Sequence, residues 1–233
     1  MKASFFDIDG TLINGFLITE FSRYLFKKGI FDKKLLAEIE NWIKLYKEDK
    51  ATYRKIVLEI PKIYSKNIKG LKERDVKNEA RKFVKLYLKK IVQPYTIYLV
   101  KLMKNYGMTI GISGSPIEVV GFVGKVFNFD LAYGSEFEIK NEVYTGKMKR
   151  KFITKEMKDV ALKKIIRQNK IDLNKSFGFG DTEQDMSILS KVKYPIALNP
   201  NKNLLKIVKG KGWMIFNSND NVAEVLKNSS LVD

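Results

Sequence analysis

The sequence contains neither cysteine nor histidine among its 233 residues. The absence of cysteine excludes disulfide bonds and thiolate chemistry. The absence of histidine removes the commonest general base and zinc ligand, so acid–base work falls to carboxylates and lysines. Any catalytic or metal site in this chain is therefore expected to consist of carboxylates, hydroxyls and ammonium groups.

Long hydrophobic runs are also missing. A membrane-spanning helix needs about 18 consecutive apolar residues, and no such run occurs. The first residues lead directly into an apolar, aspartate-containing stretch without a signal-peptide pattern. We therefore expect a cytoplasmic protein with no membrane association. A hydrophobic content of 45% over this length predicts one α/β domain with an insertion or a small second domain.

Acidic residues are in the minority, with 26 Asp and Glu against 44 Lys and Arg, which gives a net charge of +18. Such a charge raises the hypothesis of a nucleic-acid or anionic-surface partner. The lysines are scattered along almost every predicted helix, however, and a scattered pattern is more typical of a solvated surface. The sequence therefore does not favour nucleic acid as a partner, and a non-catalytic polyanion-binding protein is kept as an alternative.

The most informative stretch is the apolar run from Ala3 to Phe6, which leads into Asp7, Asp9 and Gly10. We expect a buried strand that ends in a turn at this point. Side chains two apart in a strand point the same way, so both carboxylates can face one spot. Two such close negative charges need a cation or a shared proton, and Mg²⁺ is the hard cation that prefers oxygen ligands.

Two other interpretations of this stretch are possible. A calcium-binding loop that began at Asp7 would need glycine and glutamate where this chain has Leu12 and Ile18, so that interpretation fails. A solvated turn with two exposed acids stays open on this stretch alone, because short motifs also match by chance.

Residues 14–93 show apolar residues at helical spacing and no convincing strand. Asp32 is expected to cap one helix, another is expected to start near Thr52 and to bend or end at Pro61, and Gly70 separates a fourth. This arrangement predicts a small helical bundle inserted after the first strand.

From Pro94 onward helices and strands alternate. A strand over 108–112 runs into Ser113 and Gly114, a hairpin is expected over 131–148, and a strand over 176–179 runs into Asp181 and Asp185. Further strands are expected over 194–198 and 213–216. Ligands bind outside the carboxyl ends of strands in open α/β sheets, so these turns and Asp7 should converge. This convergence argues against the solvated turn.

Taken together, these stretches resemble the ordered motifs of haloacid dehalogenase superfamily phosphohydrolases. Asp7 to Leu12 resembles the first motif, Ser113 the second, Lys158 the third, and Gly180-Asp181 with Asp185 the fourth. The chain is most similar to the phosphoserine-phosphatase-like branch, on stretches that include Thr145-Gly146-Lys147 and Ala197-Leu198-Asn199-Pro200.

The resemblance implies a Rossmann-like three-layer core with a mostly parallel sheet, formed by residues 1–13 and 94–233, and a helical cap at 14–93. It also implies a Mg²⁺-dependent phosphatase that acts on a small phosphorylated metabolite. Transfer of the phosphoryl group to an acceptor other than water is kept as an alternative, because it would use the same residues.

The resemblance further implies a role for each motif residue. Asp7 would be the nucleophile that forms an aspartyl-phosphate, and Asp9 the acid and base. Mg²⁺ would be held by Asp7, Asp181 and the backbone carbonyl of Asp9, with support from Asp185 behind them. The phosphoryl group would be bound by Thr11, Ser113, Gly114 and Lys158, with Lys155 as the rival of Lys158.

The sequence departs from the branch at two places. Where this chain has Phe16, phosphoserine phosphatases usually carry a glutamate that binds the amine of the substrate. Glu20 lies one helical turn further along this chain. The fourth motif carries Glu183 and Gln184 instead of the common Ala-Asn pair, and Gln184 is a further candidate for phosphate contact. These departures predict a small phosphomonoester other than phosphoserine as the substrate.

Overall fold

The computed structural model describes residues 1–232 and contains one seven-stranded sheet in the order β4-β3-β2-β1-β5-β6-β7. All neighbouring strands pair in parallel except β3 and β4, which are antiparallel. The strands are β1 (Ala3–Asp7), β2 (Met108–Pro116), β3 (Leu131–Lys140), β4 (Val143–Arg150), β5 (Phe177–Gly180), β6 (Tyr194–Leu198) and β7 (Met214–Phe216). The predicted mostly parallel α/β architecture is confirmed.

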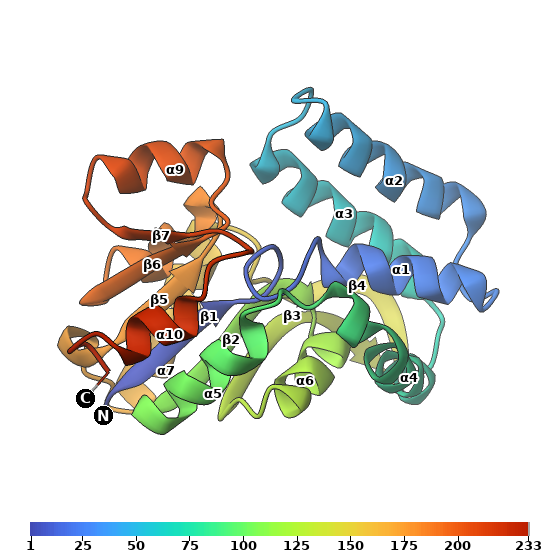
Figure 1. Cartoon of the computed structure of the whole chain (residues 1–233). Coiled ribbons are helices and arrows are strands. Elements are labelled where there is room, and N and C mark those ends of the chain that lie inside the picture. Colours follow the sequence, from blue (N-terminus) through green and yellow to red (C-terminus); the bar gives the residue numbers. More distant parts are fainter. Residues whose placement is uncertain (233) are drawn as a thin grey trace.

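Helices cover both faces of the sheet and complete three layers (Figure 1). They are α5 (Thr96–Tyr106), α6 (Ile117–Val126), α7 (Lys155–Gln168), α8 (Met186–Leu189), α9 (Lys202–Lys209) and α10 (Val222–Lys227). Phe6 packs in one hydrophobic cluster with α5, α6 and α10, whereas Phe5 packs in another with α7 and α8. Alternation of side chains along β1 therefore divides the core between the two faces.

The helical segment between β1 and α5 consists of α1 (Leu17–Lys27), α2 (Lys33–Lys47), α3 (Tyr53–Ile68) and α4 (Glu73–Ile91). The Asp32 carboxylate accepts hydrogen bonds from the first amides of α2, and the Thr52 hydroxyl caps α3. These side chains satisfy amides that have no partner inside the helix. The four helices lie beside the carboxyl end of β1 (Figure 1).

The structure decides one of the two alternatives predicted for this segment: α3 does not end at Pro61 but runs through it to Ile68. Proline removes a backbone donor and costs a helix about 3 kcal/mol. Apolar side chains beyond it, including Ile63, Tyr64 and Ile68, are buried against the core. Burial of each such side chain contributes about 1.5–3 kcal/mol, which offsets the cost of the proline.

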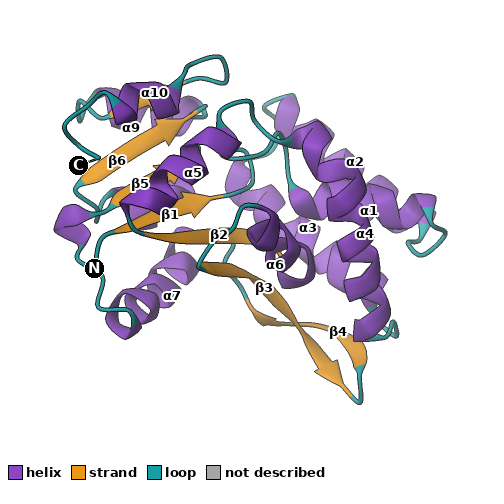
Figure 2. Cartoon of the chain, turned by 60° about the horizontal axis from the view of Figure 1, so that its bottom comes forward, coloured by secondary structure: helices purple, strands orange, loops and turns teal. Residues whose placement is uncertain are grey.

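The helical segment is also tied to the sheet. The amide of Gly70 donates to the carbonyl of Tyr144 at 2.9 Å, and the amide of Tyr144 donates to Leu71 at 3.0 Å. The amide of Glu73 donates to Glu142 at 2.8 Å. The turn between α3 and α4 thus joins the β3–β4 hairpin, which reaches out from the sheet toward α4 (Figure 2).

A correction concerns β2, which the sequence predicts to end at Ile112 and which continues to Pro116. Its pairing with β1 stops at Asp7 and Ile112, and its register with β3 is irregular between Ile112 and Pro116. Ser113 and Gly114 therefore lie in extended chain beyond the last residue of β1. No helix within residues 1–232 has both the length and the apolar character to cross a membrane.

Candidate active site

The site lies where β1 ends between its two neighbours in the sheet. Asp7 is the last residue of β1, Ser113 lies in β2 just past the end of β1, and Asp181 follows β5. Because these three strands are adjacent and parallel, their carboxyl ends meet at one edge. The convergence of these turns is confirmed.

An acidic cluster occupies this edge. Oxygen atoms of Asp7, Asp181 and Asp185 all lie within 4.8 Å of one another. The Thr11 hydroxyl donates to Asp181 Oδ1 at 2.8 Å, and a Cβ atom at Gly10 would lie 2.1 Å from Asp181 Oδ2. Gly10 has a φ of +83°, so both its backbone angle and this close approach require glycine.

Asp185 is held from behind by the turn that follows β5. Its Oδ2 accepts hydrogen bonds from the amides of Asp181 at 3.2 Å and Thr182 at 3.0 Å. The Thr182 hydroxyl donates to the same oxygen at 3.0 Å. The sequence placed Asp185 in a supporting role, and the structure brings its carboxylate into the cluster itself.

Lys158 on α7 is the cation of the cluster. Its Nζ donates to Asp7 Oδ1 at 2.5 Å and to Asp185 Oδ1 at 2.7 Å, and the residue is only 4% exposed. Burial lowers the Lys158 pKa, but the attraction of Asp185 and Asp7 outweighs burial and raises it above the usual value. Lys158 is therefore a permanent positive charge at the cluster.

The structure separates Lys158 from its rival Lys155. The Lys155 side chain is exposed at the start of α7, and its backbone amide donates to Gln184 Oε1 at 3.0 Å. Gln184 is thereby engaged with α7. Lys155 and Lys158 are three residues apart on α7, so their side chains leave the helix axis in directions that differ by about 60°. This difference places Lys155 in solvent and Lys158 in the interior.

The single positive charge of Lys158 does not neutralise the negative charges of Asp7, Asp181 and Asp185. Burial, followed by the charge of Asp185, raises the pKa of Asp7 well above its usual range, and the same two causes raise that of Asp181. Carboxylate oxygens are the ligands that Mg²⁺ prefers, and a bound cation would relieve this repulsion. The donor set therefore fits a hard divalent cation.

Asp9 has different surroundings from Asp7. Its Oδ1 accepts a hydrogen bond from the amide of Leu17 at 2.6 Å, at the positive N-terminus of α1. Its Oδ2 accepts from the hydroxyls of Ser113 and, at 2.9 Å, Ser115. Burial nevertheless raises the pKa of Asp9.

Ser115 was missed by the sequence reasoning. It lies two residues after Ser113 in β2, and the alternation of a strand puts both hydroxyls on the same side. Its amide donates to Ser113 Oγ at 2.9 Å, and its hydroxyl accepts from the amide of Ile18 at 3.0 Å. The Ser-Gly-Ser spacing was the signal that could have revealed it.

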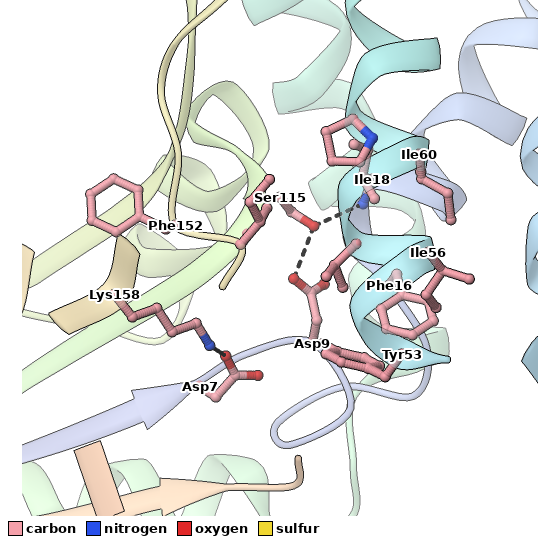
Figure 3. Close-up of a pocket in the computed structure, with 14 residues that line it drawn as sticks. Asp7, Asp9, Phe16, Ile18, Tyr53, Ile56, Ile60, Ser115, Phe152 and Lys158 are labelled. Atoms are coloured by element: carbon pink, nitrogen blue, oxygen red, sulfur yellow. Dashed lines mark hydrogen bonds and ion pairs between the residues drawn. The ribbon is translucent and has the colours of Figure 1, made fainter. Parts of the chain in front are cut away.

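A narrow cavity of about 40 Å³ opens onto Asp7, Asp9 and Lys158 (Figure 3). That volume holds only a few water molecules. Gly114, Ser115, Phe152 and Ile153 line the core side of the cavity. The opposite side belongs to the helical segment and consists of Phe16, Ile18, Tyr53, Ile56, Val57, Ile60 and Pro61.

Tyr53 is the second residue that the sequence did not single out, because it lay in an apolar stripe. Its ring lies 6.1 Å from that of Phe16, and burial followed by the charge of Asp181 raises its pKa well above the usual value. Tyr53 is therefore a neutral hydroxyl donor beside the carboxylates.

Substitution of Lys158 by methionine is expected to lower the free energy of unfolding by about 3 kcal/mol, because it leaves two buried carboxylates without their cation. Lys155→Met, three residues away and exposed, should change it by less than about 0.5 kcal/mol. Urea unfolding in chelator measures both. Equal effects of the two substitutions would contradict the buried ion pair.

Known proteins resemble this chain over most of its length. Residues 4–190 match the family model described as haloacid dehalogenase-like hydrolase. A histidinol-phosphatase from Neisseria meningitidis is 27% identical over 220 residues, which span 91% of this chain and 96% of the relative.

Solved structures show the same fold. A protein of unknown function from Bordetella pertussis has a TM-score of 0.78 at 17% identity and covers 94% of this chain and 99% of its own. A phosphoserine phosphatase, solved as an analogue of its phospho-aspartyl intermediate, has a TM-score of 0.67 at 23% identity and covers 97% of both chains. The match to the family model over most of its length shows that the chain belongs to the haloacid dehalogenase-like hydrolase family.

Proposed function

We propose that this protein is a Mg²⁺-dependent phosphatase that hydrolyses a small phosphomonoester through an aspartyl-phosphate on Asp7. The observation that carries the proposal is the pairing of two aspartates with different surroundings. Asp7 lies among Asp181, Asp185 and Lys158, whereas Asp9 is held apart by hydroxyls and an amide. One carboxylate is thus placed to attack, and the other to handle protons.

In the first step an oxygen of Asp7 forms a bond to phosphorus as the bond from phosphorus to the alcohol oxygen breaks. Asp9 gives its proton to that leaving oxygen. The raised pKa of Asp9 favours the protonated form that this step requires. The hydrogen bonds from Leu17 and Ser115 fix the direction of the carboxyl group and so prepare it for the transfer.

In the second step Asp9, now ionised, takes a proton from water as the water oxygen attacks phosphorus. The bond from phosphorus to Asp7 breaks and phosphate leaves. Lys158 and the Gly114 amide are proposed to contact the phosphoryl oxygens. The hydroxyls of Thr11 and Ser113, which donate to Asp181 and Asp9 in the structure, are proposed to turn toward those oxygens when the substrate binds. Phosphoryl transfer depends mainly on such positioning and charge stabilisation.

Asp7, Asp181 and the backbone carbonyl of Asp9 would hold the Mg²⁺ ion, and Asp185 would orient them and Lys158. The bound ion supplies positive charge that offsets the negative charge of the phosphoryl group. The fit rests on the clustered carboxylate oxygens and the raised pKa values of Asp7 and Asp181.

Residues 14–93 are proposed to act as a cap over a core formed by 1–13 and 94–233. The cavity volume of about 40 Å³ holds only a few water molecules, so entry of a phosphate ester is proposed to need movement of one wall. The hydrogen bonds from Gly70 and Glu73 to the β3–β4 hairpin hold the α3–α4 end of the cap, so the cap is proposed to rotate about this end. Movement would then be greatest at the other end of α3, near Tyr53.

The relatives suggest where to search for the substrate. One of them is named for histidinol phosphate and a solved neighbour for phosphoserine. Both are small phosphorylated metabolites, and we propose a substrate of this general kind.

The proposal is tested by release of phosphate from an aryl phosphate in Mg²⁺ and in chelator. Turnover in Mg²⁺ alone, with one phosphate released for each alcohol, supports a hydrolase. Alcohol release without equal phosphate, in the presence of a second alcohol, would indicate transfer to that acceptor. Equal rates in Mg²⁺ and in chelator would overturn the metal dependence.

Tyr53→Phe is expected to lower kcat about 10-fold, because Tyr53 lines the cavity with Asp7 and Asp9 and its hydroxyl is proposed to donate to the phosphoryl group when the cap is closed. The melting temperature should change little, since the ring is kept. Tyr46→Phe, on the neighbouring helix and 5.9 Å from the Tyr53 ring, is the matched control. An unchanged kcat in Tyr53→Phe would remove the hydroxyl from the mechanism.

A further inference from the structure

We infer that the substrate of this enzyme is a phosphate ester whose alcohol portion is uncharged and apolar or aromatic, selected by a wall that α1 and α3 build around Phe16. The inference rests on the proposed phosphatase function and names the substrate class of the same site.

The two sides of the cavity differ in chemistry. Every charged side chain that lines it, namely Asp7, Asp9 and Lys158, belongs to the core side. The wall opposite is apolar, and its one polar side-chain atom is the Tyr53 hydroxyl. Figure 3 shows Phe16, Tyr53, Ile56 and Ile60 gathered on this wall beside Asp9. The phosphate end of a substrate faces charge, and the alcohol end faces hydrocarbon.

The charged groups at the core side are engaged with one another and, in the proposed mechanism, with the phosphoryl group and the leaving oxygen. Lys158 is shared between Asp7 and Asp185, and both oxygens of Asp9 accept hydrogen bonds. A carboxylate or ammonium on the alcohol portion would therefore be buried against the wall without a partner. Burial of an unpaired charge is strongly unfavourable, whereas burial of apolar surface is favourable.

Glu20 was the residue that could have supplied a partner for an ammonium group. It forms an ion pair with Arg23, whose guanidinium also binds both oxygens of Glu40 at 2.6 and 2.8 Å. Glu20 does not line the cavity. Phe16, the residue that precedes α1, lines the cavity instead, and its ring makes a tilted aromatic pair with Tyr53. An aromatic alcohol would extend this pair.

The test compares esters whose alcohol portions carry or lack charged groups. Ethyl phosphate and phosphoethanolamine differ by one ammonium group, and isobutyl phosphate and phosphoserine are similar in size but differ in both charges. For the wild type, kcat/KM should be about 100-fold higher for the uncharged member of each pair. Benzyl phosphate should be at least as good as isobutyl phosphate. Equal values within the pairs, or higher values for the charged members, would overturn the inference.

Phe16→Glu introduces a carboxylate into the wall, and Phe16→Leu is the matched apolar control. The ratio of kcat/KM for phosphoethanolamine to that for ethyl phosphate should rise about 10-fold in Phe16→Glu and stay unchanged in Phe16→Leu. Because the ratio is taken within one variant, partial loss of folded protein does not affect it. An unchanged ratio in Phe16→Glu would remove Phe16 from specificity.

Binding separates this inference from the proposed function. Calorimetry with Asp7→Asn, which is expected to bind esters without cleaving them, ranks the same pairs by Kd. If no ester is turned over by the wild type, the proposed function fails, and the order of the Kd values still decides the inference. Tighter binding of the charged members would overturn it even if turnover is found.

Discussion

Asp7→Asn is expected to lower kcat for an aryl phosphate by at least about 10⁴-fold, because the amide cannot form the aspartyl-phosphate. With a cation bound, the Asp7 carboxylate is ionised and needs no deprotonating base, and Lys158 donates hydrogen bonds to both Asp7 and Asp185. Asparagine keeps the shape of the side chain and loses only the charge and the nucleophile. Substrate binding should therefore survive while turnover is lost.

The same variant should be at least as stable as the wild type in chelator. Burial and the charges of Asp185 and Asp9 raise the pKa of Asp7, so its ionised form is unfavourable in the folded state without a cation. The control is Asp49→Asn, which changes the net charge equally at an exposed ion pair with Lys202. Steady-state kinetics and thermal unfolding of both variants are the measurements. A fall in kcat of less than about 100-fold in Asp7→Asn would rule out the covalent route.

The turns at the strand ends could be predicted from the sequence because their chemistry is local. A buried apolar run followed by acids and glycine specifies both a strand and its end, and the parallel topology then brings Asp7 and Asp181 together. The spacing of Asp32 and Thr52 before apolar-periodic stretches likewise identified the starts of α2 and α3. These features depend on residues within a few positions of one another.

Other features depend on contacts that no local pattern encodes. Helix α3 passes through Pro61 because side chains beyond it find a core elsewhere in the chain. Strand β2 continues to Pro116 because it pairs with β3 beyond the end of β1. Tyr53 belongs to the site because α3 lies across the cavity, 46 residues from Asp7 in the sequence. Tertiary packing decided each of these.

The apolar wall of the cavity also could not be predicted from local sequence patterns. The resemblance to phosphoserine phosphatases implied a glutamate where this chain has Phe16, and it left Glu20 as a possible substitute. Only the structure shows that Glu20 is paired with Arg23 and that Ile56 and Ile60 from another helix complete the wall. The apolar residue at position 16 is thus part of a larger apolar surface to which two helices contribute.

Mg²⁺ is expected to raise the melting temperature, and the increase should be larger at about pH 8 than at about pH 5. Burial and the charge of Asp185 raise the folded-state pKa of Asp7 and Asp181. A raised carboxyl pKa gives stability that is complete below the unfolded pKa of about 3.9 and is lost as the pH rises through the folded value. The metal-free protein therefore loses stability over that range, and Mg²⁺, which competes with the protons, restores it.

Asp181→Asn tests the role of this carboxylate in metal binding. At a Mg²⁺ concentration of about 100 times Kd the wild type should gain about 2.7 kcal/mol, or about 5–10 °C in melting temperature. The variant should lose most of this gain and should itself be more stable than the wild type in chelator at about pH 8, because one negative charge of the cluster is gone. Asp49→Asn should keep the full Mg²⁺ effect. Two results would contradict this site: a Mg²⁺-induced increase in melting temperature that is the same at both pH values, or one that is unchanged in Asp181→Asn. Either result would mean that Mg²⁺ binds elsewhere. The repulsion among the carboxylates would then be relieved by protonation alone.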